Sequence, residues 1–185
     1  MTDFSSYNLT PSAKEALVRA QEIAGENGHL KVIDVHLIYS IFKGEQNNIK
    51  FAMDMNGWLP EGFMTALELV LESYKEPKRK YRIFAKEIFE ILDKSRDLAE
   101  KTKDDFIGVD HMLITILKTR NELRTFFIGL RIDVDKFCST LLYVIKNGID
   151  YNSPPPMVEV VAPSSTTSNT KTKPDIDDWC ENINQ

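Results

Sequence analysis

The sequence contains few cysteines and no long apolar segment. Cys138 and Cys180 are its two cysteines, and their wide separation indicates neither a disulfide framework nor a metal-ligand spacing. We therefore expect a reducing, cytoplasmic environment. No apolar run approaches the roughly 20 residues that a membrane-spanning helix needs. The first ten residues, MTDFSSYNLT, lack the basic and apolar regions of a secretion signal, so we expect no contact with a membrane.

An excess of positive charge is also missing. The chain has 23 Lys and Arg residues against 28 Asp and Glu residues, which gives a net charge of -5. Most of this charge lies from Asp150 onward, where acidic residues outnumber basic ones, so the rest of the chain is nearly neutral. A neutral body without a basic stripe argues against nucleic acid as the main partner.

The residue patterns of common enzymes are absent as well. No GxxxxGK[ST] phosphate loop occurs in the sequence, which excludes nucleotide hydrolysis by this chain. The three histidines, His29, His36 and His111, show no Ser-His-Asp or Cys-His arrangement. A metal site built on His29 and His36 lacks a third and a fourth ligand nearby. We expect neither an enzyme nor a bound metal or cofactor.

What the sequence does contain is an internal repeat. A composition of 42% apolar and 28% charged residues is typical of one soluble globular domain. The segment KVIDVHLIYSIF, which starts at Lys31, returns 75 residues later as FIGVDHMLITIL, with His36 matching His111. Two small helical units that cannot each close a core must pack against one another. The repeat therefore predicts an all-α module with a seam between its halves.

Helical patterns fill both copies. Thr10 and Pro11 are suited to start the first helix, and small apolar residues then recur at three- and four-residue spacing up to Ala24. Asp34 is a candidate cap for the second helix. Pro77 lies between the halves and makes a continuous helix through them unfavourable. We expect four helices in each half, over about 11–24, 35–43, 48–56, from 60, 83–99, the FIGVDHMLITIL segment, a short helix reaching 128, and 133–147.

The composition changes sharply after residue 150. Residues 150–174 are rich in proline, serine and threonine, which predicts a flexible linker. The apolar stretch MVEVV at 157–161 lies among prolines, so we interpret it as extended linker and not as a strand. Residues 175–185, DIDDWCENINQ, are again partly apolar and aromatic. They indicate the beginning of a further folded unit.

Together these segments resemble the N-terminal repeat domain of the Clp-family AAA+ unfoldases. The resemblance rests on LTPSAKEALVRAQEIA and VIDVHLIYSIF in the first half and on YRIFAKEIF and FIGVDHMLITIL in the second. ClpA is the most similar subgroup of the ClpA/ClpC type, and DDWCENINQ resembles the start of its first ATPase module. The resemblance implies an eight-helix domain with pseudo-twofold symmetry over residues 1–149, with repeats at about 7–75 and 80–149, a linker at 150–174 and the start of an ATPase module at 175–185.

The same resemblance implies a binding function. Such domains hold protein substrates or adaptor proteins and deliver them to a hexameric unfoldase for unfolding and degradation. A ClpP-like peptidase would be a partner only through the ATPase region, which this sequence lacks. The alternative is a free-standing N-domain that regulates or decoys a Clp machine by competing for adaptors or substrates.

The resemblance also carries site residues over by position. In ClpC relatives, two glutamates that bind phosphorylated arginine align with Val35 and Asp110. Because valine cannot pair with a cation, we expect such binding in the second half alone. In ClpA relatives, acidic residues that dock the adaptor ClpS align near Leu30 and Val35, so docking of that adaptor in the usual way is not expected. Leu30, Val32 and Val35 either form an apolar binding surface or pack in the core.

A third set of positions comes from ClpB relatives. Their apolar groove for unfolded segments aligns with Lys94, Leu98 and His111, of which only Leu98 is apolar here. The helical pattern also places Leu98 toward the core. For His36 and His111, which occupy the same position in the two copies, we expect a capping or packing role at the start of a helix.

Overall fold

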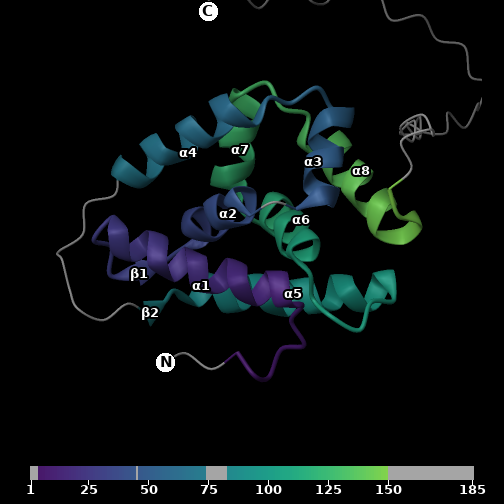
Figure 1. The fold of residues 1–185 in the computed structure, drawn as a ribbon, viewed down its shortest axis with the longest axis horizontal. Helices are drawn as coiled ribbons and strands as arrows, with labels where there is room; N and C mark the ends of the chain where they lie inside the picture. The colour runs from purple at the N-terminus through teal and green to yellow at the C-terminus, as the bar shows by residue number, and fades with distance from the viewer. Residues whose placement is uncertain (1–3, 45, 74–82, 150–185) are drawn as a thin grey trace, which may run out of the picture.

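The computed structural model describes residues 4–44, 46–73 and 83–149, and this part of the chain forms eight helices and two short strands (Figure 1). In chain order these are α1 (Pro11–Glu26), β1 (Lys31–Val32), α2 (Asp34–Lys43), α3 (Asn47–Met55), α4 (Pro60–Ser73), β2 (Ile83–Phe84), α5 (Lys86–Thr102), α6 (Val109–Thr119), α7 (Asn121–Gly129) and α8 (Val134–Asn147). The linker expected at 150–174, the ATPase start expected at 175–185 and the boundary between the repeats lie outside the described residues.

Helix α1 forms as its sequence predicts. The Thr10 hydroxyl accepts a hydrogen bond from the Ala13 N–H at 3.1 Å, and Pro11 occupies the first helical position, where no N–H is needed. The predicted stripe is the buried face of the helix. It consists of Ala13, Ala16, Leu17, Ala20, Ile23 and Ala24. The small alanines let α1 pack closely on α2.

The start of α2 differs from the prediction. Asp34 is not the N-cap, because the helix begins at Asp34 and Ile33 precedes it as the cap residue. The Asp34 carboxylate instead accepts the Val35 N–H at 2.9 Å and the Arg120 Nε–H at 2.6 Å. Arg120 lies between α6 and α7, so this ion pair joins the two halves. A carboxylate in the first turn still interacts favourably with the helix dipole.

The helices are arranged as two interlocked halves. In Figure 1, α1 and α5 run along one edge of the molecule, α2 and α6 occupy the centre, and the remaining helices lie beyond them. Helix α2 packs on α1, α4 and α6, while α6 packs on α5, α7 and α8. Helix α3 of the first half packs on α8 of the second half. The seam therefore runs through the middle of one shared core.

Two short parallel pairings were not predicted. Strand β1 pairs with β2 in the register Val32 to Phe84, and Leu9 forms an isolated parallel bridge with Ile107. In both cases the segment before the second helix of one half pairs with the segment before the first helix of the other half. For this reason α5 begins at Lys86 and not near residue 83. Pairings of one or two residues are too short to produce a period-two pattern in the sequence.

An aromatic cluster fills the seam at the end opposite these strands. The ring centroids of Phe63 in α4 and Phe127 in α7 are 4.7 Å apart. Trp58 stacks on Phe137 of α8 at 4.4 Å with an angle of 13° between the rings. Aromatic pairs at these distances add to the stabilisation from burial. Neither half could bury these rings alone.

Candidate functional site

The repeated histidines hold the starts of α2 and α6. Nδ1 of His36 accepts the Ile33 N–H at 3.0 Å, and Nδ1 of His111 accepts the Gly108 N–H at 3.0 Å. Each ring thus satisfies a backbone donor that the first helical turn leaves without a carbonyl partner. Both side chains are buried. The geometry matches the capping role expected from the sequence.

The second ring nitrogen has different partners in the two copies. Nε2 of His36 lies 2.8 Å from Nδ1 of His29. Nε2 of His111 lies 3.1 Å from Oδ2 of Asp104 and 3.0 Å from the Thr102 hydroxyl. His29 and Asp104 occupy equivalent positions, 75 residues apart. The copies therefore share a scaffold and differ in charge.

Asp110 is the most unusual polar residue at the start of α6. Its Oδ2 accepts a hydrogen bond from Nδ2 of Asn48, a residue of α3, at 2.7 Å. Its Oδ1 is buried and accepts no hydrogen bond from the described residues. Burial raises the pKa of the Asp110 carboxyl, although the Asn48 hydrogen bond and the His111 ring oppose that rise.

Asp110 and His111 line a hollow of about 490 Å³, which we call the acidic pocket. Its other charged residues are Lys103, Asp104 and Asp105. The remaining lining residues are Thr10, Asn48, Phe106, Gly108, Val144, Ile145 and Gly148. Three carboxylates and one ammonium give the pocket a negative balance, which suits a cationic group.

The other residues carried over from relatives do not share this pocket. Val35, the counterpart of Asp110, is buried in the core with Val32, while Leu30 is partly exposed. The sequence left open whether Leu30, Val32 and Val35 form an apolar binding surface or pack in the core. Val32 and Val35 pack in the core. Lys94 is exposed and Leu98 is half-buried on α5, and neither lines the acidic pocket. Of the carried-over residues, Asp110 and His111, which are neighbours in the sequence, line the acidic pocket, and the others do not.

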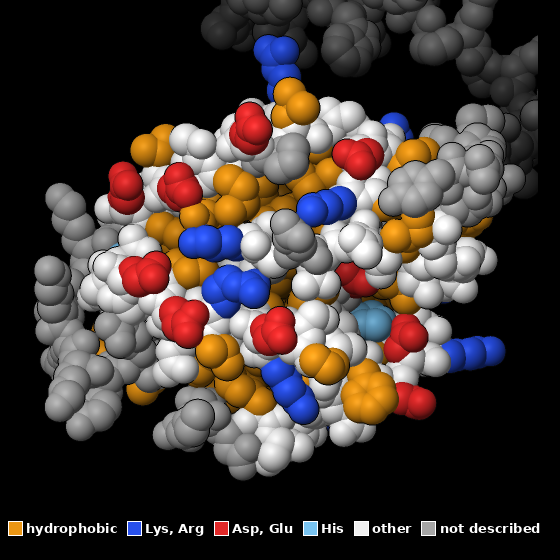
Figure 2. Space-filling view, viewed as in Figure 1, with side chains coloured by type: hydrophobic (Ala, Val, Ile, Leu, Met, Phe, Trp, Pro, Cys, Tyr) orange, Lys and Arg blue, Asp and Glu red, His pale blue; other side chains and the backbone are white. Residues whose placement is uncertain are grey.

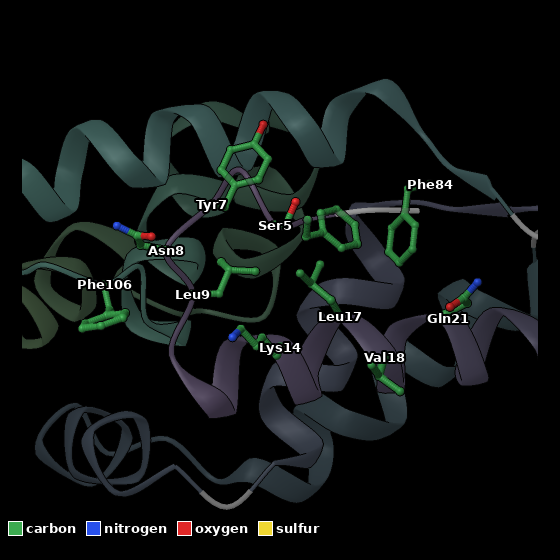
Figure 3. A pocket seen from close by; sticks show the side chains of 11 residues that line it. Ser5, Tyr7, Asn8, Leu9, Lys14, Leu17, Val18, Gln21, Phe84 and Phe106 are labelled. Carbon is green, nitrogen blue, oxygen red and sulfur yellow. The ribbon is translucent and has the colours of Figure 1, made fainter. Parts of the chain in front are cut away.

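An apolar groove that the sequence did not reveal lies beside α1 (Figure 3). We call it the α1 groove, and its volume is about 490 Å³. It is lined by Phe4, Ser5, Tyr7, Asn8, Leu9, Lys14, Leu17, Val18, Gln21, Phe84 and Phe106. Figure 3 shows that these side chains come from the N-terminal segment, α1, β2 and the loop before α6.

The N-terminal segment is fixed firmly enough to form one wall of the groove. The Thr10 N–H donates to the Ile107 carbonyl at 3.0 Å, and the Ile107 N–H donates to the Asn8 carbonyl at 2.6 Å. The ring of Phe4 meets Phe84 edge to face at 4.8 Å. Aromatic residues ahead of the first helix were the available sequence signal for this wall.

The middle of the segment is tied to α5 through Tyr7. The Tyr7 hydroxyl donates to the Asp93 carboxylate at 3.0 Å, and the Arg96 guanidinium lies 5.5 Å from the Tyr7 ring. Burial and the hydrogen bond to Asp93 raise the pKa of the Tyr7 hydroxyl. These contacts connect the wall of the groove to the second half of the molecule.

The groove exposes large apolar side chains to solvent. Val18 and Phe106 are each 56% exposed, and Figure 2 shows hydrophobic side chains between charged ones on the face that carries α1. Phe106 lines both the α1 groove and the acidic pocket, so the two hollows are neighbours. An exposed apolar hollow with a polar rim is typical of a surface that binds another molecule.

Metal-binding clusters and membrane-spanning helices are absent from the part of the chain that the structure describes. Residues 4–44, 46–73 and 83–149 hold no group of three or more His, Cys, Asp or Glu side chains that could bind a metal ion. Within the same ranges, no helix has both the length and the apolar character needed to span a membrane.

Known proteins match most of the described chain. The family model of the Clp repeat (R) N-terminal domain matches residues 8–128, more than half of the sequence. Chaperone protein ClpB of Nitratidesulfovibrio vulgaris is 32% identical over 117 residues, which are 60% of this chain and 13% of the relative. ClpB of Bacillus cereus is 26% identical over 147 residues, which are 75% of this chain and 17% of the relative. The chain thus spans less than a fifth of these relatives' length.

Solved structures share the fold. The N-terminal domain of Hsp104 from Candida albicans has a TM-score of 0.68 at 14% identity, over 80% of this chain and 97% of that one. The N-domain of ClpV from Vibrio cholerae has a TM-score of 0.63 at 15% identity, over 75% of this chain and 85% of that one. A complex of a ClpV N-domain with a VipB peptide has a TM-score of 0.58 at 15% identity, over 74% of this chain and 88% of that one.

These matches confirm the all-α module predicted from the repeat and the Clp N-domain fold that the resemblance implied. The curated relatives described above are ClpB chaperones, so the assignment to the ClpA subgroup stays a prediction. The chain belongs to the family of Clp repeat N-terminal domains.

Proposed function

We propose that this chain captures segments of protein substrates or adaptor proteins for a Clp-family ATP-dependent unfoldase. The observation that carries the proposal is the exposed, apolar α1 groove in a domain of this family. The curated relatives are chaperones, and one ClpV N-domain of the same fold has been solved with a VipB peptide. The captured protein would then be unfolded and degraded by modules outside this sequence.

The groove has the composition that a bound peptide requires. Leu9, Leu17 and the aromatic rings offer an apolar floor for side chains. Asn8 and Gln21 offer amide groups that can pair with peptide backbone N–H and C=O groups. A few buried apolar anchors within a polar rim carry most of the affinity in such contacts. No catalytic group is needed for this task.

Capture also fits the expected arrangement of the longer protein. A binding domain tethered to an ATPase ring raises the local concentration of its cargo at the ring without any new contact. The ring, and any ClpP-like peptidase that binds it, would act in the cytoplasm. Docking of ClpS in the usual way is not part of the proposal, because Leu30 and Val35 replace the acidic residues of ClpA relatives.

The test is substitution of the exposed apolar residues of the groove. Val18→Asp and Phe106→Asp place a charge where an apolar anchor would bind, and both side chains are 56% exposed, so the fold is retained. We expect each variant to bind reduced, carboxymethylated α-lactalbumin about tenfold more weakly or worse in calorimetry. Leu69→Asp is the matched control, because Leu69 is 63% exposed on α4 and lies outside the groove. Unchanged binding by both groove variants would remove the groove from the proposal.

We infer a second subsite, at Asp110, which binds a cationic group of the partner. It is supported by the buried Oδ1 that accepts no hydrogen bond from the described residues and by the negative balance of the acidic pocket. This agrees with the expectation that phosphoarginine binding of the ClpC type survives in the second half alone. Asp110→Ala should abolish binding of free phosphoarginine, and Asp105→Asn, at an exposed position, should weaken it less. Equal binding by parent and Asp110→Ala would exclude Asp110 from the site.

A further inference from the structure

The α1 groove contains one charged residue among the eleven that line it. That residue is Lys14, which lies between Phe106 and Leu17 in Figure 3. Lys14 is exposed on α1, and no ion pair among the described residues involves it. Its ammonium group is thus an uncompensated positive charge at the edge of an apolar surface.

The charges of Arg96 and Asp93, next to Tyr7 of the groove, are paired with each other. Arg96 contacts the Tyr7 ring, and its Nη2 lies 3.1 Å from the Asp93 carboxylate. Asp93 also accepts the Tyr7 hydroxyl hydrogen bond. This pair therefore presents little net charge to a molecule in the groove, and Lys14 is the charged residue that the lining itself contributes.

A partner that covers this apolar surface places one of its own groups next to the Lys14 ammonium, and the charge of that group affects binding. A carboxylate placed opposite Nζ gains a charge-assisted hydrogen bond, strengthened by the low dielectric of the covered groove. A neutral partner leaves the lysine to extend toward water. A basic partner side chain at the same place is repelled. The groove therefore discriminates among partners by charge as well as by apolar area.

We propose that the α1 groove selects partner segments in which one acidic residue lies between aromatic or aliphatic residues, with the carboxylate on Lys14. This rests on the proposed function and specifies its partner. The acidic residue must lie within the groove, because beyond Phe106 the segment would meet the carboxylates of Asp104 and Asp105 in the acidic pocket.

The test uses three fluorescent synthetic peptides, GSFLEVFSG, GSFLQVFSG and GSFLKVFSG, and the full chain. Fluorescence anisotropy should show the Glu peptide binding about fivefold more tightly than the Lys peptide, with the Gln peptide between them. This size is expected for one partly solvated charge pair at an interface. Raising the salt concentration to 0.5 M should reduce the difference, because exposed charges are screened.

Charge reversal at the lysine gives the decisive comparison. Lys14→Glu should reverse the order, so that the Lys peptide binds most tightly. Lys118→Glu changes the net charge of the protein equally at an exposed position of α6 outside the groove, and it should keep the parent order. A reversal in both variants would reflect net charge alone and would overturn the inference.

The outcomes separate this inference from the proposed function. Equal binding of all three peptides, lost on Val18→Asp, would overturn charge selection while leaving capture in the groove intact. Absence of binding by every peptide and by unfolded α-lactalbumin would overturn the proposed function itself. If Lys14→Glu kept the parent order of peptide affinities, a residue other than Lys14 would be responsible for the charge preference, and the inference would be overturned.

Discussion

His36 and His111 keep one role in both copies of the repeat, whereas the residues around them have diverged. Both rings accept a backbone N–H at the start of a helix. One ring then meets another imidazole, His29, and the other meets the carboxylate of Asp104. The two copies of the repeat share the capping histidine, which the helix start requires, and differ at the positions that contact its second ring nitrogen. The same divergence separates buried Val35 from Asp110.

Asp110 should make the stability of the protein depend on pH. Burial raises the pKa of its carboxyl, so the folded state holds the proton more strongly than the unfolded state does. The resulting stabilisation is complete at acid pH, below the unfolded pKa of about 4, and is lost as pH rises through the folded pKa. Asp110→Asn mimics the protonated acid. We therefore expect its Tm to exceed that of the parent at pH 7, with the difference shrinking toward pH 3.

Thermal unfolding followed by circular dichroism across this pH range makes the measurement. Asp105→Asn, an exposed carboxyl in the same pocket, serves as the control and should leave the pH dependence close to that of the parent. A lower Tm for Asp110→Asn at pH 7 would mean that the ionised carboxylate stabilises the fold. Keeping an ionised carboxylate at Asp110 for ligand binding would then not destabilise the folded protein.

At the scale of the element, the ends of α3 and α7 show the same turn with different residues. Trp58 N–H donates to the Met53 carbonyl at 3.0 Å, and Ile132 N–H donates to the Phe127 carbonyl at 3.1 Å. The residue before each donor is left-handed, with φ of 69° at Gly57 and 62° at Arg131. Glycine adopts this conformation without strain, while an arginine does not. The second repeat therefore carries a strained helix end.

Exchanging residue types at these two ends should move stability in opposite directions. Arg131→Gly relieves the strain and should raise the free energy of unfolding by about 0.5–1 kcal/mol. Gly57→Ala should lower it by about 1 kcal/mol, since an added Cβ meets no atom within 4 Å and only the backbone is strained. Urea unfolding measures both changes. A loss of stability in Arg131→Gly would show that the arginine side chain makes a compensating contact.

The elements also show what the sequence could and could not predict. Helical periodicity predicted the helices and the buried face of α1, because each depends on residues close together in the chain. The seam contacts of Asp34 with Arg120 span 86 residues, and no local pattern encodes them. The α1 groove likewise combines Phe4, Val18 and Phe106 from three distant segments. Asp110 was singled out through the resemblance to ClpC relatives, in which a glutamate that binds phosphorylated arginine aligns with it.

At the scale of the whole molecule, contacts between the halves occur at both ends of the seam. The Leu9–Ile107 bridge and the β1–β2 pair close one end, and the aromatic cluster of Trp58, Phe63, Phe127 and Phe137 closes the other. Ion pairing of Asp34 with Arg120 adds a polar contact between them. Since each half lends residues to the core of the other, we expect the described residues to unfold as one cooperative unit.

Phe127→Ala tests this cooperativity. Phe127 is fully buried in α7, and its truncation should lower the free energy of unfolding by about 3–5 kcal/mol. If the halves unfold together, hydrogen exchange should accelerate by the same factor in the most protected amides of α2 and α6, although α2 belongs to the other half. Leu69→Ala, an exposed residue of α4, should leave both rates nearly unchanged. Acceleration confined to α6, α7 and α8 would show that each repeat is stable by itself, and the shared core would then be a docking surface between two independent units.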